Sequence, residues 1–148
     1  MAGGGARSVD GARAVARLSK RLEGALGDVD LSLPQYRLLV FLSRRAEVAS
    51  GLAGGLAVSP PTVTTLVDGL VARALVERTP DADDRRRVRH ELTPAGRRLL
   101  ADADAALDER LRSLAANLPA AQARRALDAL EFWHAALDAE FERVTSRS

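Results

Sequence analysis

The 148-residue sequence contains no cysteine. Disulfide bonds, redox sensing by a reactive thiolate and zinc sites with cysteine ligands are therefore excluded. The sequence has only two histidines, which disfavours a transition-metal site, and we expect neither a metal nor another cofactor. Aromatic residues make up 3% of the chain. Such a low content disfavours strand-rich folds and the aromatic platforms that stack single-stranded nucleic acids.

Long apolar runs and a signal peptide are also missing from the sequence. No apolar run approaches the roughly 20 residues that a membrane-spanning helix needs. We therefore expect a cytoplasmic protein that does not contact a membrane. The length fits a single domain, which we place at residues 8–148 after a disordered, glycine-rich leader at residues 1–7.

The small net charge of +2 is unevenly distributed along the chain. Residues 69–100 hold eight arginines against five acidic residues, whereas residues 101–142 hold nine acidic residues against four arginines. A basic centre and an acidic helical tail fit a protein with one part that faces DNA and another part that faces away from it.

A helix-turn-helix is predicted in the middle of the chain. Ser59 is the expected N-cap of its second helix, and the prolines that follow suit a first helical turn, where the backbone N–H has no partner. Spacings of three and four give this helix an apolar face, formed by Val63, Leu66, Val67, Leu70 and Val71. The opposite face is short and polar and contains Thr62, Thr64, Thr65, Asp68 and Gly69. This front suits a helix in the DNA major groove, although a plain amphipathic helix with a threonine-rich solvent face fits the same pattern.

A two-stranded wing is predicted directly after this helix. Residues 75–78 and 88–92 have strand patterns, and a polar tip at residues 81–87 separates them. The three adjacent arginines of the tip repel one another, and contact with phosphates or with a narrow minor groove explains them better than folding does. We expect Asp84 to hold the side chain of Arg86 in an extended pose. A solvated turn is the alternative interpretation.

Further helices are predicted at residues 8–27, from Leu33 onward, at about 50–57, at 94–117 and after Pro119. The helix at 50–57 contains three glycines, each of which costs about 1 kcal/mol relative to alanine in a helix interior. We therefore expect this helix to form because it packs against the rest of the domain. A close approach of its backbone to a DNA phosphate is an alternative reason for the glycines.

The first and last helices carry apolar stripes that need a partner. Large side chains such as Phe132 and Trp133 lie near the end of the chain, where little sequence remains to cover them. Exposed apolar patches of this kind mark interfaces. We therefore predict an obligate homodimer, with interface residues Val15, Leu18, Leu22, Leu127, Leu130, Trp133, Leu137 and Phe141.

Three segments of the chain, residues 33–42, 52–78 and 83–96, resemble the MarR family of bacterial transcription regulators. The most specific part is Asp84-x-Arg86 followed by Leu92-Thr93 and Gly96. The resemblance implies a mainly helical fold with a small β-wing. It places a winged helix-turn-helix at residues 33–96 and dimerisation helices at residues 8–27 and 97–146.

The same resemblance implies a homodimer that binds a pseudo-palindromic operator in double-stranded DNA. It also implies a pocket for a phenolic or carboxylate ligand, to which we assign Arg17 and Tyr36. Family members usually carry charged residues in place of Gly54 and Gly55, and often carry arginine in place of Thr65 and Gly69. Because of these departures, the resemblance does not predict which operator sequence the protein binds.

The sequence thus predicts a sequence-specific DNA-binding transcriptional regulator, a repressor that a small ligand releases. The residues predicted to contact DNA are Ser59, Pro60, Pro61, Thr62, Thr64, Thr65, Arg73, Asp84, Arg85, Arg86 and Arg87. The alternative is a winged-helix module that binds or scaffolds proteins without specific DNA binding, which would have no need for the arginine-rich tip. An enzyme is not expected, because neither His90 nor His134 has the neighbours that a nucleophile requires.

Overall fold

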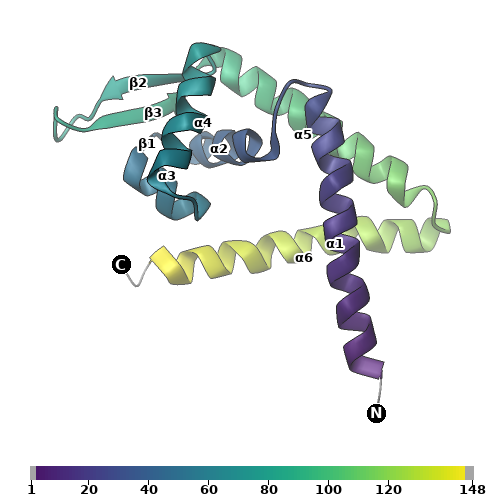
Figure 1. Ribbon diagram of the computed structural model, residues 1–148. Coiled ribbons are helices and arrows are strands. Elements are labelled where there is room, and N and C mark those ends of the chain that lie inside the picture. Colours follow the sequence, from purple (N-terminus) through teal and green to yellow (C-terminus); the bar gives the residue numbers. More distant parts are fainter. Residues whose placement is uncertain (1–2, 146–148) are drawn as a thin grey trace. The chain divides into compact units, whose positions relative to one another are not determined.

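The computed structural model describes residues 3–145 and is mainly helical (Figure 1). Its elements are α1 (Gly3–Gly27), α2 (Leu33–Arg44), β1 (Glu47–Val48), α3 (Ala49–Leu56), α4 (Pro60–Ala72), β2 (Val76–Pro80), β3 (Val88–Leu92), α5 (Pro94–Ala115) and α6 (Ala120–Thr145). The chain forms two compact units, a first that extends to Leu107 and a second that starts at Asp108. Within the described residues, no helix is long and apolar enough to cross a membrane. The predicted fold class, a mainly helical chain with a small β-wing, is confirmed.

The core of the first unit is built from aliphatic side chains of α1, α2, α3, α4 and β2. Its fully buried members are Leu26, Leu38, Leu39, Leu52, Val63, Val67, Leu70 and Val76. Burial of each such side chain stabilises the fold by roughly 1.5–3 kcal/mol relative to its exposure. Because α4 contributes three of these residues at helical spacing, the core fixes which side of α4 faces outward.

Side-chain caps set the helix boundaries, as the sequence predicts for α4 and α5. Ser59 caps α4 by accepting a hydrogen bond from the Thr62 backbone. The Thr93 hydroxyl oxygen accepts from the Gly96 N–H at 3.0 Å and also donates to the Ala74 carbonyl at 2.7 Å. The capping box of Ser32 and Gln35 at the start of α2 was not predicted.

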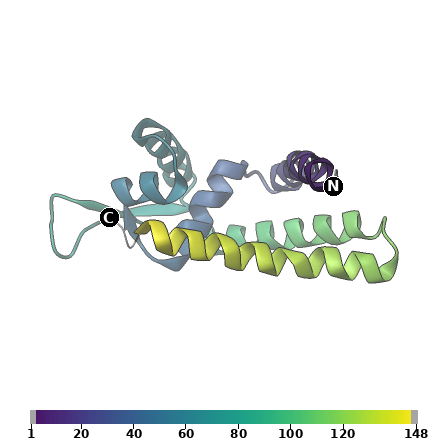
Figure 2. The same cartoon turned by 90° about the horizontal axis from the view of Figure 1, so that it is seen from below.

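The β2–β3 hairpin is the predicted two-stranded wing, but it belongs to a three-stranded antiparallel sheet whose third strand was not predicted. The strand order is β1-β3-β2, and β1 pairs with β3 through Glu47 opposite His90 and Val48 opposite Arg89. The strand β1 has only two residues, too few to show the alternation by which a strand is recognised in a sequence. The β2–β3 hairpin extends away from α2, α3 and α4 in two perpendicular views (Figures 1 and 2).

The first helix begins earlier than the sequence suggests. We predicted a disordered leader at residues 1–7 and a cap at Ser8, but α1 already starts at Gly3, and residues 1–2 lie outside the described part. No proline interrupts this segment, and each residue added to an existing helix gains one backbone hydrogen bond. Residues 3–7 of the predicted leader therefore continue the helix despite their glycines.

The glycines of α3 differ in their surroundings. A β-carbon on Gly55 would lie 2.1 Å from the ring of Phe41 in α2, which is too close for any real contact. A β-carbon on Gly54 would meet no atom within 4 Å. Gly55 therefore lets α3 pack closely against α2, which supports the interpretation that this helix exists because it packs.

We expect Gly55→Ala to lower the free energy of unfolding by about 1–3 kcal/mol, because the new methyl group forces the Phe41 ring or α3 to shift. Gly54→Ala is the matched control in the same helix. It should raise the free energy of unfolding by about 0.5–1 kcal/mol, because alanine favours helix and the added methyl group meets nothing. Urea unfolding of both variants measures these changes, and equal effects would contradict the packing role of Gly55.

Candidate nucleic-acid interface

The N-terminal half of α4 presents the predicted polar front to solvent. Thr62, Thr64 and Thr65 are exposed, whereas Val63 and Val67 on the other side of the helix are 1% exposed. The apolar back packs against α2, α3 and β2. Ser59, Pro60 and Pro61 are exposed in the turn before the front. The structure thus brings the residues predicted for the reading helix onto one outward surface.

A buried carboxylate organises the tip of the wing. Asp81 is 7% exposed, and its side chain accepts hydrogen bonds from the backbone N–H groups of Asp83 at 2.9 Å and Asp84 at 3.2 Å. Its second oxygen pairs with Arg89 at 3.4 Å. The two backbone hydrogen bonds lower the pKa of Asp81 against the opposing effect of burial, and the charges of Arg89 and Arg87 lower it further. Arg89 also donates to the carbonyl of Ala46 at 2.7 Å, which ties the wing to the segment before β1.

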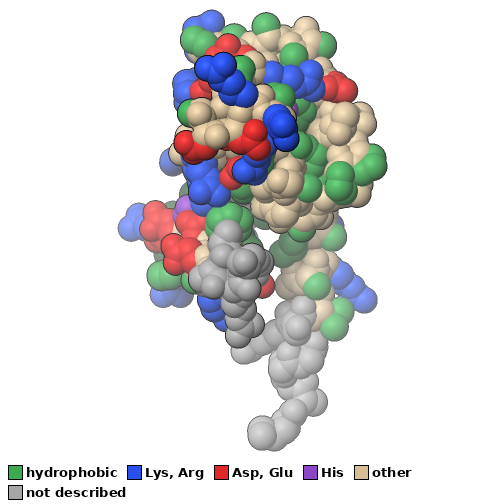
Figure 3. All heavy atoms as spheres, turned by 90° about the vertical axis from the view of Figure 1, so that its left-hand side faces the viewer, with side chains coloured by type: hydrophobic (Ala, Val, Ile, Leu, Met, Phe, Trp, Pro, Cys, Tyr) green, Lys and Arg blue, Asp and Glu red, His purple; other side chains and the backbone are tan. Residues whose placement is uncertain are grey.

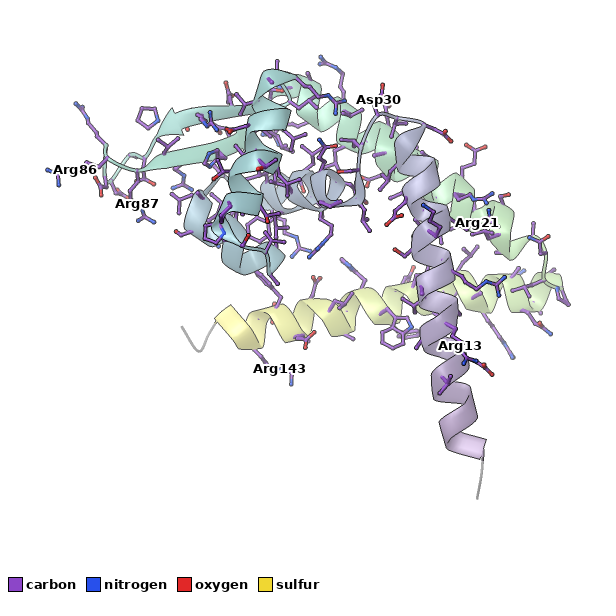
Figure 4. The ribbon with its side chains drawn as sticks, viewed as in Figure 1. Arg13, Arg21, Asp30, Arg86, Arg87 and Arg143 are labelled. Atoms are coloured by element: carbon purple, nitrogen blue, oxygen red, sulfur yellow. The ribbon has the colours of Figure 1, made fainter. Side chains whose placement is uncertain are left out.

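Backbone hydrogen bonds close the tip into a fixed loop. The N–H of Asp81 donates to the carbonyl of Arg87 at 2.9 Å, and the N–H of Arg87 donates to the carbonyl of Asp84 at 2.9 Å. Arg85, Arg86 and Arg87 are exposed on this loop. Arg86 and Arg87 lie at the outer end of the β2–β3 hairpin (Figure 4), and arginines and acidic residues lie close together on the surface that Figure 3 shows.

The role that we predicted for Asp84 is wrong in detail. Its side chain accepts a hydrogen bond from the backbone N–H of Arg86 at 3.0 Å instead of holding the Arg86 guanidinium. A short acidic side chain bonds the backbone two residues ahead more readily than it reaches a long side chain. The roles of Asp81 and Arg89 were not predictable, because these residues have the same types as their exposed neighbours and differ from them only in burial.

An ion pair links α4 to the wing. Arg78 of β2 donates to the carboxylate of Asp68, which lies on the polar front of α4. Both side chains are partly exposed. The pair adds to the direct contact between α4 and β2, so the threonine front and the arginine tip belong to one structural unit.

Arg73 does not join the other predicted DNA contacts. It is the C-cap of α4, and its guanidinium donates to the carbonyl of Asp30 at 2.7 Å. It therefore lies about 20 Å from Ser59, at the opposite end of the 13-residue helix. This contact ties α4 to the loop between α1 and α2, where Asp30 has a positive φ of 57°.

The two residues assigned to a ligand pocket have different surroundings. Tyr36 donates from its hydroxyl to Asp104 of α5 at 2.7 Å. Partial burial, this hydrogen bond and the negative charge of Asp104 raise the pKa of Tyr36. Arg17 is exposed on α1. The phenol of Tyr36 therefore joins α2 to α5, and its oxygen can only accept a further hydrogen bond from a ligand.

The predicted interface residues include several large apolar side chains that are exposed to solvent. On α6, Trp133 is 68% exposed and Leu137 is 61% exposed, and on α1 Val15 is 67% exposed. Leu130 is also exposed, and the other predicted members are half-buried: Leu18, Leu22, Leu127 and Phe141. Phe132, at 76%, is the most exposed of the large apolar side chains in the described part of the chain.

The two histidines occupy different environments. His90 is buried in β3 at the predicted inward position, with Nδ1 3.2 Å from the carbonyl of Glu47 in β1. Burial lowers the pKa of His90. His134 of α6 lies 3.3 Å from Asp138, one helical turn away.

The comparisons with known proteins show what this arrangement resembles. The sequence model described as the MarR family matches residues 29–87, which include α2, β1, α3, α4 and β2 and end at the tip of the wing. No curated protein sequence matches the chain. The resemblance to the MarR family that the sequence predicts is confirmed by this match and by the solved structures that share the fold.

Three of those structures show the extent of the likeness. A MarR family transcriptional regulator from Rhodococcus sp. RHA1 is 29% identical, with 81% of this chain and 87% of that chain covered and a TM-score of 0.64. Apo MarR from E. coli is 22% identical, with 82% and 88% covered and a TM-score of 0.70. A MepR variant from S. aureus bound to an oligodeoxyribonucleotide is 22% identical, with 88% and 97% covered and a TM-score of 0.65.

We expect Asp81→Asn to destabilise the protein at pH 7, because an amide binds the two backbone N–H groups and Arg89 more weakly than a carboxylate does. The folded-state pKa of Asp81 is depressed, so its contribution is fully present above the unfolded-state value of about 3.9. The contribution is lost as the pH falls through the folded-state pKa. The stability difference between wild type and variant should therefore shrink as the pH falls below about 4.

Urea unfolding between pH 7 and pH 3 measures this difference. Asp83→Asn is the matched control, because Asp83 is an exposed neighbour that contributes only its backbone N–H to the cluster. Equal stability of the two variants at pH 7 would show that Asp81 does not organise the tip.

Proposed function

We propose that this chain, which matches the MarR family in sequence and fold, is a sequence-specific regulator of transcription that binds double-stranded DNA. One observation carries the proposal: the exposed threonine front of α4 and the arginine-rich wing tip belong to one unit, because α4 contacts β2 directly and the pair of Asp68 and Arg78 bridges them. A helix fits the major groove of B-DNA, and arginine is favoured in the narrow minor groove. A helix and a wing at a fixed separation can enter neighbouring grooves of one duplex.

The two parts of this surface would contribute differently to DNA binding. Arg85, Arg86 and Arg87 carry positive charge on a hydrogen-bonded loop and would contact phosphates or the minor groove, which supplies affinity. The uncharged threonines of α4 would contact base edges, which supplies sequence preference. Arg73 is engaged with Asp30, so we assign it to the fold and leave it out of the proposed contacts.

A homodimer follows from the apolar side chains that α1 and α6 leave exposed. Trp133 and Leu137 are too large to remain in water without a partner of similar character. A two-fold dimer would set two copies of α4 about one DNA turn apart, roughly 34 Å, and would match a pseudo-palindromic operator.

We further propose that the protein represses transcription and that a phenolic or carboxylate ligand releases it from DNA. The exposed Arg17 can pair with a carboxylate, and the Tyr36 oxygen can accept a hydrogen bond while it donates to Asp104. Such a ligand acts by binding one dimer geometry more tightly than the other.

A thermal-shift screen of phenolic acids should find a stabilising compound that also weakens DNA binding. A screen that finds no such compound would contradict the proposed release by a ligand.

Arg86→Ala should weaken binding to the operator duplex by about 1–3 kcal/mol per half-site and leave the unfolding temperature unchanged. The Arg86 side chain is exposed and makes a phosphate or groove contact only in the complex. The slope of log affinity against log salt should also fall by about 1 for each lost phosphate contact. Fluorescence anisotropy at two salt concentrations measures both quantities.

Arg125→Ala on α6 is the matched control, because Arg125 is an equally exposed arginine far along the chain from the wing. It should change neither affinity nor salt dependence. If Arg86→Ala lowered thermal stability as much as it lowered binding, the arginine would be structural and the proposed interface would be wrong.

Leu137→Asp should convert the protein from a dimer to a monomer, because a carboxylate cannot be buried in an apolar interface without a partner. Sedimentation at micromolar concentration should give twice the chain mass of 15.8 kDa for the wild type and the single mass for the variant. Ala135→Asp introduces the same charge on the opposite side of α6 and should remain dimeric. A monomeric wild type would contradict the dimer.

A further inference from the structure

From Pro60 to Val63, the first turn of α4 has no free backbone N–H group to offer to DNA. The first turn of a helix normally leaves its N–H groups unpaired, and these groups bind phosphates. Here Pro60 and Pro61 have no N–H, and the next two N–H groups, of Thr62 and Val63, donate to the side chain and the carbonyl of Ser59 at 3.4 Å and 3.1 Å. The usual anion site at the start of a recognition helix is therefore absent from this stretch of the chain.

The threonine hydroxyls of the front are also occupied as donors. Thr64 donates to the carbonyl of Pro60 at 3.2 Å, and Thr65 donates to the carbonyl of Pro61 at 3.1 Å. A carbonyl oxygen can only accept, so the hydroxyl hydrogen must point back into the helix in both cases. What each exposed side chain presents outward is an oxygen lone pair and a methyl group.

The residues on either side of these threonines add little donor capacity. The hydroxyls of Ser59 and Thr62 lie 2.8 Å apart, so one of their two hydrogens is used between them. One turn further along the front, Asp68 is an acceptor when ionised, and it already engages Arg78. From Ser59 to Asp68, the outward surface of α4 therefore consists mainly of acceptors and methyl groups.

We propose that this face of α4 reads A·T base pairs in the core of each operator half-site. In the major groove, thymine presents its C5 methyl group and adenine presents the N6 amino donor. Threonine methyl groups can pack against the thymine methyl group, and threonine oxygen lone pairs can accept a hydrogen bond from the adenine amino group. Guanine presents the acceptors N7 and O6, which need donors such as arginine or lysine that this face does not supply. Cytosine presents an amino donor but no methyl group, so the threonine methyl contacts are what favour A·T over G·C. The inference depends on the proposed DNA-binding function and names the sequence that this function selects.

The first test is a selection of duplexes from a randomised library with the full-length wild-type protein. The half-sites that it enriches should then be modified one atom group at a time. Deoxyuridine in place of thymidine removes one methyl group and should weaken binding about fourfold, the equivalent of about 0.8 kcal/mol per buried methyl. Purine in place of adenine removes the N6 amino donor and should also weaken binding. Replacement of guanine by 7-deazaguanine removes the N7 acceptor and should have no effect.

Two double variants separate the methyl group from the hydroxyl. Thr64→Ser combined with Thr65→Ser keeps both hydroxyls and removes both methyl groups, so this protein should bind thymidine and deoxyuridine duplexes equally. Thr64→Val combined with Thr65→Val keeps the methyl groups and removes the acceptors, so it should keep the preference for thymidine and lose sensitivity to the adenine amino group. Both positions are exposed, and unfolding temperatures near that of the wild type confirm that the variants are folded.

The outcomes distinguish this inference from the proposed function. If the wild type enriches no duplex and shows no salt-dependent binding, the DNA-binding function itself fails. If it enriches half-sites whose binding depends on guanine N7, or if the serine variants still prefer thymidine, the protein binds DNA but does not read it in the proposed way.

Discussion

The burial of one side of α4 is the constraint on which the rest of this protein depends. Val63, Val67 and Leu70 are almost completely enclosed, and rotation of the helix would expose all three at a cost of roughly 1.5–3 kcal/mol each. The threonines are held outward for that reason, since the helix cannot bury its back and turn its front inward at the same time. The contact between α4 and β2, to which the exposed ion pair of Asp68 with Arg78 adds, keeps the wing beside the helix.

The wing shows how a cluster of like charges is held on a small hairpin. Adjacent arginines repel one another, but the buried carboxylate of Asp81 binds the loop backbone and pairs with Arg89 below them. The loop is therefore ordered before any ligand arrives, and less conformational freedom is lost when it binds. Donors are concentrated in this tip, whereas acceptors and methyl groups dominate α4, so the proposed function assigns phosphate contacts and base preference to separate elements.

Features that depend on neighbours in the sequence were predictable. Ser59 and Thr93 cap helices within three residues, and the strand at residues 88–92 has the predicted bounds, because caps and alternation are local patterns. Contacts between distant segments were not predictable. Arg73 to Asp30 and Arg89 to Ala46 each join residues 43 positions apart, and nothing in the local sequence distinguishes these arginines from exposed ones.

The sequence by itself determined the family resemblance, the order and faces of the helices, and the wing with its exposed arginines, because periodicity and capping act over a few residues. Only the tertiary structure decided that β1 completes the sheet, that Gly55 makes room for Phe41, and that Asp81 organises the tip. These outcomes depend on which surfaces meet when the chain closes on itself. Burial gives an ordinary aspartate or glycine a role that its neighbours of the same type do not have.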